Sequence, residues 1–409
     1  MILPAGAAPE ARLLLMARAL RAFVDGFICI LLPAYLLALG LGAWEVGVLS
    51  AVTLLGSAGL TLLLGAQGHR FHHRPLLLGG ALLMVATGLL FAGLSGFWPL
   101  LLVAFIGTLN PSSGDVSVFL PLEHARLAEA AQGEARTHLF ARYTLVGSLF
   151  AALGALVAGL PEILAGLGWD RLASLRVMFL LYALAGLGVW LLYLRLPEPA
   201  VRTATTPSAP LAASRGVVLR LAALFSLDAF AGGLVLNALL ALWLFERFGL
   251  SLAAAGSFFF WAGLLSAFSQ LAAPLVARRI GLINTMVFTH IPASLFLILA
   301  ALADSLGWAI GLLLARAALS QMDVPTRSAF VMAVVTPAER TAAASYTAVP
   351  RSLAAAVSPS LGGALFAAGW LAAPLVACGL LKIAYDLLLW RSFRRHGQKE
   401  GGAPRACTG

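Results

Sequence analysis

Long apolar runs, separated by short polar or Gly- and Pro-containing segments, follow one another along nearly the whole chain. A helix needs about 20 predominantly apolar residues to cross the hydrocarbon core of a bilayer. The pattern therefore predicts twelve membrane-spanning helices joined by short connections. We place them near residues 18–40, 44–66, 75–95, 98–120, 139–160, 174–194, 218–244, 252–276, 284–303, 306–333, 341–366 and 369–390.

Composition narrows the class of protein further. Of the 409 residues, 61% are hydrophobic and 11% are charged, whereas about 25% of the residues of a soluble domain are charged. These values exclude soluble enzymes, secreted disulfide scaffolds and disordered regulators. The three cysteines stand far apart and give no disulfide or zinc framework. We predict an all-α polytopic membrane protein and expect no cofactor.

The basic residues set the predicted orientation. Most of the 27 Lys and Arg residues fall in the termini and the even-numbered loops. Cytoplasmic loops of membrane proteins carry such an excess, so we predict a multi-pass protein of the cell inner (plasma) membrane with both termini cytoplasmic. Because this charge is spread over many short loops and forms no single stripe, nucleic acid is not an expected partner.

A change in composition divides the chain at its midpoint. Residues 196–217 are rich in Pro, Ala and Thr between two apolar blocks, and this pattern predicts a cytoplasmic linker. It separates an N-terminal six-helix half, residues 1–195, from a C-terminal six-helix half, residues 218–390. Residues 391–409 are basic and contain glycine, so we expect a disordered cytoplasmic tail.

The two halves also match each other in sequence. Five short matches occur in the same order in both halves, at offsets of 203 to 209 residues. Such an ordered series is hard to obtain by chance, so the chain is predicted to be a duplicated six-helix unit. The matches are Asp25-Gly-Phe27 with Asp228-Ala-Phe230, Gly47 with Gly256, Arg70 with Arg279, Asp115-Val116 with Asp323-Val324, and Tyr143-Thr144-x-Val146 with Tyr346-Thr347-x-Val349.

The loop after the second span reads Gly65-Ala-Gln-Gly-His69-Arg70-Phe71-His72-His73-Arg74. With its two six-helix halves and central linker, the chain resembles the major facilitator superfamily of secondary transporters, which carries Gly-x-Leu-Ala-Asp-Arg-x-Gly-Arg-Arg at this place. The first Gly and two arginines are kept, while histidines replace the Asp and the second Gly. The resemblance implies that spans 1, 4, 7 and 10 line a central cavity and that transport proceeds by alternating access about a midplane site.

Acidic residues inside the spans agree with this expectation. A carboxylate at the centre of a bilayer costs about 2.5–3.5 kcal/mol even on a lenient scale. Asp25, Asp115, Asp228 and Asp323 lie one each on spans 1, 4, 7 and 10, and Asp386 on span 12 is the exception. We expect Lys382 and Asp386, at i and i+4, to form a local pair or to snorkel.

The deeper charges predict a substrate or proton pathway. Asp25 and Asp228 lie about 12–15 Å from the cytoplasmic ends of their spans at 1.5 Å per residue. In our functional interpretation, one aspartate binds a proton or cation and an arginine supplies its counter-charge. A static ion pair between the halves is the alternative. The pathway candidates are Asp25, Asp228, Arg316, Arg351, Asn237 and Tyr346.

Charges near the cytoplasmic end predict a gate. The pseudo-symmetry pairs Arg70 with Asp115 and Arg279 with Asp323. Arg327, one helical turn after Asp323, is a second partner at i+4. The gate candidates are Arg70, Asp115, Arg142, Arg279, Asp323 and Arg327. The histidines at positions 69, 72 and 73 suggest a metal site or a pH sensor as alternatives. They lack carboxylate or thiolate neighbours in sequence, so we expect a solvated loop cluster and no metal site.

These patterns predict a secondary active transporter, proton-coupled, that exports a small organic molecule and functions as a monomer in the lipid bilayer. An exporter of metal or inorganic ions is the alternative, with Asp25, Asp228 and Asn237 as oxygen ligands. A non-transporting membrane sensor on the same fold is a further alternative. No motif of an intramembrane protease is complete, so an enzyme is not expected.

Overall fold

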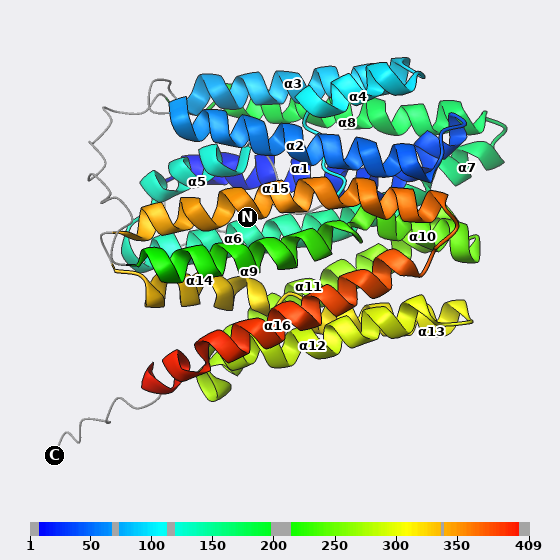
Figure 1. Cartoon of the computed structure of the whole chain (residues 1–409). Helices are drawn as coiled ribbons and strands as arrows, with labels where there is room; N and C mark the ends of the chain where they lie inside the picture. Colours follow the sequence, from blue (N-terminus) through cyan, green and yellow to red (C-terminus); the bar gives the residue numbers. More distant parts are fainter. Residues whose placement is uncertain (1–7, 68–72, 113–118, 198–213, 337–338, 401–409) are drawn as a thin grey trace. The chain divides into compact units, whose positions relative to one another are not determined.

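The computed structural model describes residues 8–67, 73–112, 119–197, 214–336 and 339–400 (Figure 1). These residues form helices and contain no strand. Nine helical stretches among them are long and apolar enough to cross a membrane. They are α1 (Glu10–Ala38), α2 (Ala43–Gln67), α3 (His73–Gly93), α6 (Gly133–Leu156) with η2 (Val157–Gly159) and α7 (Leu160–Gly166), α8 (Arg171–Leu194), α9 (Arg215–Gly233) with α10 (Asn237–Phe248), α11 (Leu252–Ile280), α12 (Leu282–Ala301) and α16 (Ala373–Glu400).

Three further segments complete the twelve predicted spans. Two are split into shorter helices, α4 (Phe97–Ile106) with α5 (Phe119–Ala130), and α13 (Leu306–Leu319) with α14 (Asp323–Val334). The third is α15 (Arg340–Ala367), which carries polar residues and two arginines along its length. The predicted all-helical membrane fold is thus confirmed, and each apolar run corresponds to one of these segments.

Spans 4, 7 and 10 are interrupted, although each was predicted as one helix. Span 4 breaks after Gly107, where Pro111 has no backbone N–H to continue a helix. Span 7 breaks between Gly233 and Asn237. The freed backbone groups of these two breaks bond each other: the Ala238 N–H donates to the Pro111 carbonyl at 3.0 Å. Discontinuous spans of this kind bring backbone polar groups to the interior of transporters.

The structure differs from the prediction at the boundaries of the tail and of the linker. The disordered tail was expected from residue 391, but α16 continues to Glu400, so this expectation is wrong for its first ten residues. The helical pattern simply extends past the last apolar turn into the basic segment. At the other boundary α9 begins at Arg215, three residues before the expected start of the C-terminal half at residue 218. Residues 198–213 lie outside the described part of the chain.

The chain forms two compact units. The first unit contains residues 1–205, 233–264 and 355–374, and the second contains residues 206–232, 265–354 and 375–409. α11 and α15 contribute to both units. One boundary, between residues 205 and 206, falls inside the predicted linker, whereas the others lie within the second half of the chain. The division into six-helix halves stays a prediction.

Two glycines of the sequence repeat hold close helix crossings inside the first unit. A Cβ atom on Gly47 of α2 would lie 2.7 Å from the Cα atom of Gly363 on α15, and a Cβ on Gly363 would lie equally close to Gly47. On α11, a Cβ on Gly256 would collide with the carbonyl oxygen of Ala155 on α6. Both repeat positions therefore place a segment of the chain's second half directly against the backbone of a helix in its first half.

Replacing Gly47 by alanine is expected to lower the free energy of unfolding by about 1–3 kcal/mol, because the added methyl group must displace backbone atoms. Gly59 on the same helix is the matched control, since a Cβ there meets nothing within 4 Å. Gly59→Ala should be neutral or stabilise by up to about 1 kcal/mol through helix propensity. Thermal unfolding in detergent measures both, and equal shifts would contradict the close crossing.

Candidate functional site

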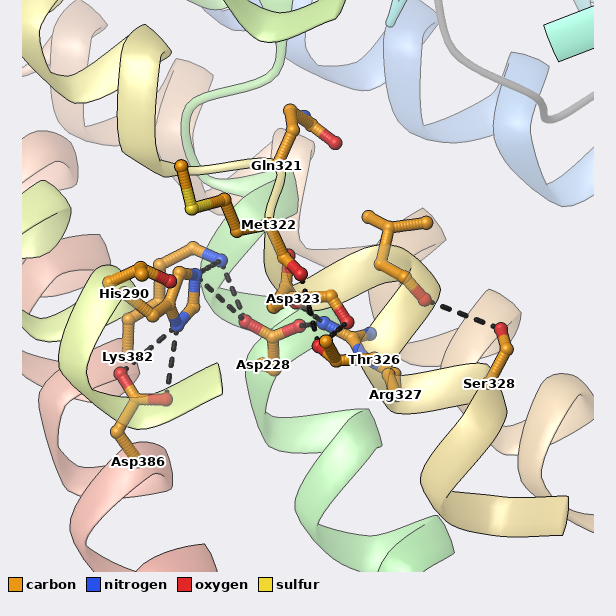
Figure 2. Close-up of polar contacts among 12 residues, drawn as sticks. Asp228, His290, Gln321, Met322, Asp323, Thr326, Arg327, Ser328, Lys382 and Asp386 are labelled. Carbon is orange, nitrogen blue, oxygen red and sulfur yellow. Dashed lines mark hydrogen bonds and ion pairs between the residues drawn. The ribbon is translucent and has the colours of Figure 1, made fainter. Parts of the chain in front are cut away.

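Asp228 is the centre of a buried ionic cluster in the second unit (Figure 2). It lies on α9 and is 5% exposed. One carboxylate oxygen, Oδ1, accepts a hydrogen bond from Lys382 Nζ of α16 at 2.7 Å. The other, Oδ2, accepts one from Arg327 Nη2 of α14 at 2.8 Å. A single carboxylate therefore joins three helices, and both of its oxygens are bound to cations.

The break in span 10 positions Arg327 for this contact. Asp323 is the first residue of α14, where an acidic side chain is favourable at the positive end of the helix dipole. The Thr326 hydroxyl donates to the carbonyls of Met322 and Asp323, both at 3.0 Å, and so satisfies backbone oxygens at the break. Arg327 forms an ion pair with Asp323 one turn before it. The predicted i,i+4 pair is thus confirmed, and the same guanidinium also reaches Asp228.

A histidine connects Asp228 with a second carboxylate. His290 lies on α12, and its Nδ1 atom is 3.1 Å and 3.0 Å from the two oxygens of Asp386 on α16. Its Nε2 atom is 3.4 Å from Lys382 Nζ and 4.0 Å from Asp228 Oδ1. We call these side chains of α9, α12, α14 and α16 the second-unit cluster, and its members are Asp228, His290, Asp323, Arg327, Lys382 and Asp386 (Figure 2).

The expected local pair of Lys382 with Asp386 is wrong, because each residue has its main partner on another helix. Lys382 reaches across to Asp228, and Asp386 reaches His290. The i,i+4 spacing puts both on one face of α16, and that face packs against helices that carry opposite charges and an imidazole. His290 was missed altogether, because a single histidine in an apolar span gives no pattern to recognise.

Only one of the two predicted gate pairs, Arg279 with Asp323, lies within the described residues. Arg70 and Asp115 lie outside the described residues. Arg279 is exposed on the last turn of α11 and forms no ion pair within the described part of the chain. The expected Arg279–Asp323 pair is therefore wrong here, since Asp323 binds Arg327. Arg142 is half-buried on α6 of the first unit.

The remaining pathway candidates occupy different environments. Asn237 is the first residue of α10, and its side-chain Nδ2 donates to the Ser112 carbonyl at 2.9 Å, next to the break in span 4. Tyr346 on α15 is 54% exposed. Arg316 is half-buried in the last turn of α13, and Arg351 is exposed on α15. Neither arginine forms an ion pair with a described residue, so the predicted counter-charges of Asp228 are replaced by Arg327 and Lys382.

Asp25 differs from Asp228, its match in the repeat. It lies half-buried on α1 in the first unit. Among the described residues it has neither a hydrogen bond nor an ion pair. Arg21, one turn earlier, and Arg18 act on it electrostatically from a distance. The two aspartates are equivalent in sequence and unlike in structure.

A separate buried cluster holds Arg21. Glu123 on α5 is 0% exposed, and its carboxylate accepts hydrogen bonds from Arg21 of α1 and Tyr143 of α6. The Tyr193 hydroxyl of α8 donates to the other oxygen at 2.6 Å. We call Arg21, Glu123, Tyr143 and Tyr193 the first-unit cluster. Sequence reasoning missed Glu123 because span 4 was predicted to end at residue 120, whereas α5 continues to Ala130.

Among the described residues, no group of three or more His, Cys, Asp or Glu side chains is arranged so that it could hold a metal ion. His69 and His72 of the loop after span 2 lie outside these residues, and His73 begins α3. The three ligands suggested for an ion exporter, Asp25, Asp228 and Asn237, are therefore not supported by a specific contact.

Comparisons with known proteins agree with the helical architecture. A family model described as the Major Facilitator Superfamily matches residues 14–321. The chain is 26% identical over 394 residues to the uncharacterized membrane protein YJR124C of Saccharomyces cerevisiae, and the match covers 88% of each chain.

Solved transporter structures share this fold at low identity. A bacterial homologue of the human lysosomal transporter Spinster, in an inward-facing and occupied conformation, matches with a TM-score of 0.73 and 17% identity over 94% of this chain and 97% of that one. The nucleoside transporter NupG matches with a TM-score of 0.70 and 15% identity over 94% of this chain and 99% of that one.

Proposed function

The chain belongs to the major facilitator superfamily, and we propose that it is a secondary active transporter that exports a small organic molecule in exchange for protons. Transport proceeds by alternating access about a site inside the membrane. The protein acts as a monomer in the inner membrane with both termini cytoplasmic. NupG, which has the same fold, is described as a nucleoside transporter, and a small organic substrate is consistent with that description.

Proton exchange is supported by the different surroundings of Asp25 and Asp228, of which only Asp228 is bound to cations. Protonation of Asp228 would disrupt two contacts with cations, to Arg327 and Lys382. Protonation of Asp25 would break no hydrogen bond or ion pair with a described residue. Intramembrane carboxylates in transporters mark ion and proton pathways. We therefore assign the exchanging proton to Asp25, and we assign Asp228 to the ionic cluster that holds four helices of the second unit together.

Asp25→Asn is expected to abolish proton-driven transport while it leaves substrate exchange intact, because an amide cannot carry the proton but preserves the size of the side chain. The assay uses proteoliposomes with a trapped pH-sensitive dye. Organic anions, organic cations and nucleosides are added in turn to find a compound that moves protons through the wild-type protein. Counterflow of that compound, with equal pH on both sides, then measures exchange without proton movement.

Asp304→Asn is the matched control, since Asp304 is exposed in the turn between α12 and α13 and loses the same charge. It should behave like the wild type in both assays. If Asp25→Asn still moves protons with the compound at the wild-type rate, Asp25 is not the proton carrier. If no compound moves protons through the wild-type protein while counterflow occurs, the protein is a uniporter or uses another ion, and proton exchange is wrong.

A further inference from the structure

The second unit contains more membrane-embedded cations than carboxylates. The three buried aspartates of its predicted spans each have a partner: Arg327 and Lys382 for Asp228, Arg327 for Asp323, and His290 for Asp386. Two arginines are left over, Arg316 and Arg351, with no ion pair among the described residues. Among these aspartates and their arginine and lysine neighbours in the spans, four cations (Arg316, Arg327, Arg351 and Lys382) face three anions.

Both remaining arginines lie in the electrostatic field of the second-unit cluster. Arg351 on α15 interacts electrostatically with Arg327, Asp228 and Asp323. Arg316 on α13 lies near Cys378 of α16, and Lys382 lies one helical turn after Cys378 on the same helix. The positive charge of Arg316 is thus close to the helix that carries Lys382. Charged side chains in membrane spans pair with one another or face a water-filled path, and they mark substrate routes.

Some buried hydrogen-bond donors in and beside the second-unit cluster have no acceptor among the described residues. Arg327 is buried, and its Nε and Nη1 atoms have no partner among the described residues. The hydroxyl of Tyr385, on the same helix as Lys382 and Asp386, is fully buried and likewise without a partner there. Tyr385 lies near Arg327 of this cluster. Buried donors without a partner call for an acceptor such as a water molecule or an anion.

We propose that the transported molecule is a small organic anion and that Arg316 and Arg351 bind its carboxylate or other oxyanion group. This inference rests on the proposed transport function and adds the substrate class to it. A guanidinium group binds a carboxylate through two parallel hydrogen bonds, which is a geometry that lysine cannot supply. The anion supplies the fourth negative charge to these four cations and three aspartates of the spans, and its oxygens accept hydrogen bonds from the unpartnered donors.

Binding to the purified full-length protein in detergent tests the substrate class without any transport step. The probes are sets of three molecules of nearly equal shape and different charge: benzoate, benzamide and benzamidine, with the corresponding naphthalene compounds. Binding is measured by the shift of thermal unfolding against ligand concentration. The carboxylates are expected to stabilise the wild-type protein, and the amides and amidines are not.

The arginine variants then locate the site. Arg316→Gln and Arg351→Gln should each weaken carboxylate binding roughly tenfold or more, since each removes hydrogen bonds to a charged group. Arg316→Lys keeps the charge and should weaken binding less than Arg316→Gln. The control is Arg220→Gln on α9, an exposed arginine of the same unit, which should bind carboxylates like the wild type.

Three results would overturn the proposal: no carboxylate stabilises the wild-type protein, the amidines stabilise it instead, or the Arg316→Gln, Arg351→Gln double variant binds carboxylates as tightly as the wild type. The last result would leave Arg316 with a purely local role at the negative end of the α13 dipole. Failure of proton exchange in proteoliposomes is a separate result, because carboxylate binding in detergent requires neither a gradient nor Asp25.

Discussion

Replacing Asp228 by asparagine is expected to lower the free energy of unfolding by about 3–5 kcal/mol, the cost of removing one partner from a buried ion pair. The carboxylate binds Lys382 and Arg327 at 2.7 Å and 2.8 Å. An amide of the same size leaves the Lys382 ammonium group without a counter-charge in its hydrogen-bonding range, and it offers Arg327 only a neutral acceptor. The variant should therefore unfold at a lower temperature in detergent and lose transport together with counterflow.

Asp304→Asn again provides the control, because it removes an exposed aspartate of the same unit. It should change the free energy of unfolding by less than about 0.5 kcal/mol, as surface substitutions usually do. A change in Asp228→Asn as small as that of the control would mean that the cluster adds nothing to stability. In that case Asp228 would be free to exchange a proton, and the division of roles between Asp25 and Asp228 would fail.

A double variant separates two effects of Asp228→Asn, the loss of attraction between Asp228 and Lys382 and the cost of a buried Lys382 charge without a partner. Lys382→Met keeps an unbranched side chain of similar length and removes the ammonium group. Combined with Asp228→Asn, it should destabilise the protein by less than the sum of the two single effects, because no unpaired ammonium remains. Residues that share one ionic network show such coupling, typically about 0.5–3 kcal/mol. Strict additivity would contradict a direct ion pair between Asp228 and Lys382.

The membrane segments could be predicted from the sequence because a bilayer imposes a length and an apolar surface on every helix. The interruptions could not be predicted in the same way. Residues 233–236 at the break in span 7 read Gly-Leu-Val-Leu, which is as apolar as the helices on either side. The break is compensated by bonds to span 4, including the one from Ala238 to Pro111, and such a distant partner leaves no local signal.

The candidate site was predictable only where partners are close in sequence. Arg327 and Asp323 are one helical turn apart, and their ion pair was predicted. His290 and Asp386 are separated by 96 residues, and nothing in the order of residues shows that α12 and α16 bring them together. The spacing of Lys382 and Asp386 suggested a local pair for the same reason, because helix periodicity shows which residues share a face but not which helix packs against that face.

The residues matched by the predicted repeat have partly similar and partly different surroundings in the structure. Gly47 and Gly256 both hold close crossings, as equivalent positions should. Asp25 and Asp228 occupy equivalent positions as well, yet only Asp228 is enclosed by cations. Lys382 and Arg327 are not among the matched residues of the predicted repeat. The sequence matches therefore include two glycines at close helix crossings, but they do not include the ionic partners of Asp228.

Glu123→Gln is expected to lower the free energy of unfolding by about 3–5 kcal/mol, since the buried Arg21 loses its carboxylate partner. The Glu123 carboxylate also accepts from Tyr143 and Tyr193, so removing one tyrosine hydroxyl, as in Tyr193→Phe, should cost less, about 1.5–3 kcal/mol. The control is Glu129→Gln on the same helix, where the side chain is 55% exposed. It should change the free energy of unfolding by less than about 1 kcal/mol. Denaturation in detergent ranks the three variants, and an equal effect of Glu123→Gln and Glu129→Gln would contradict a buried cluster that joins α1, α5, α6 and α8.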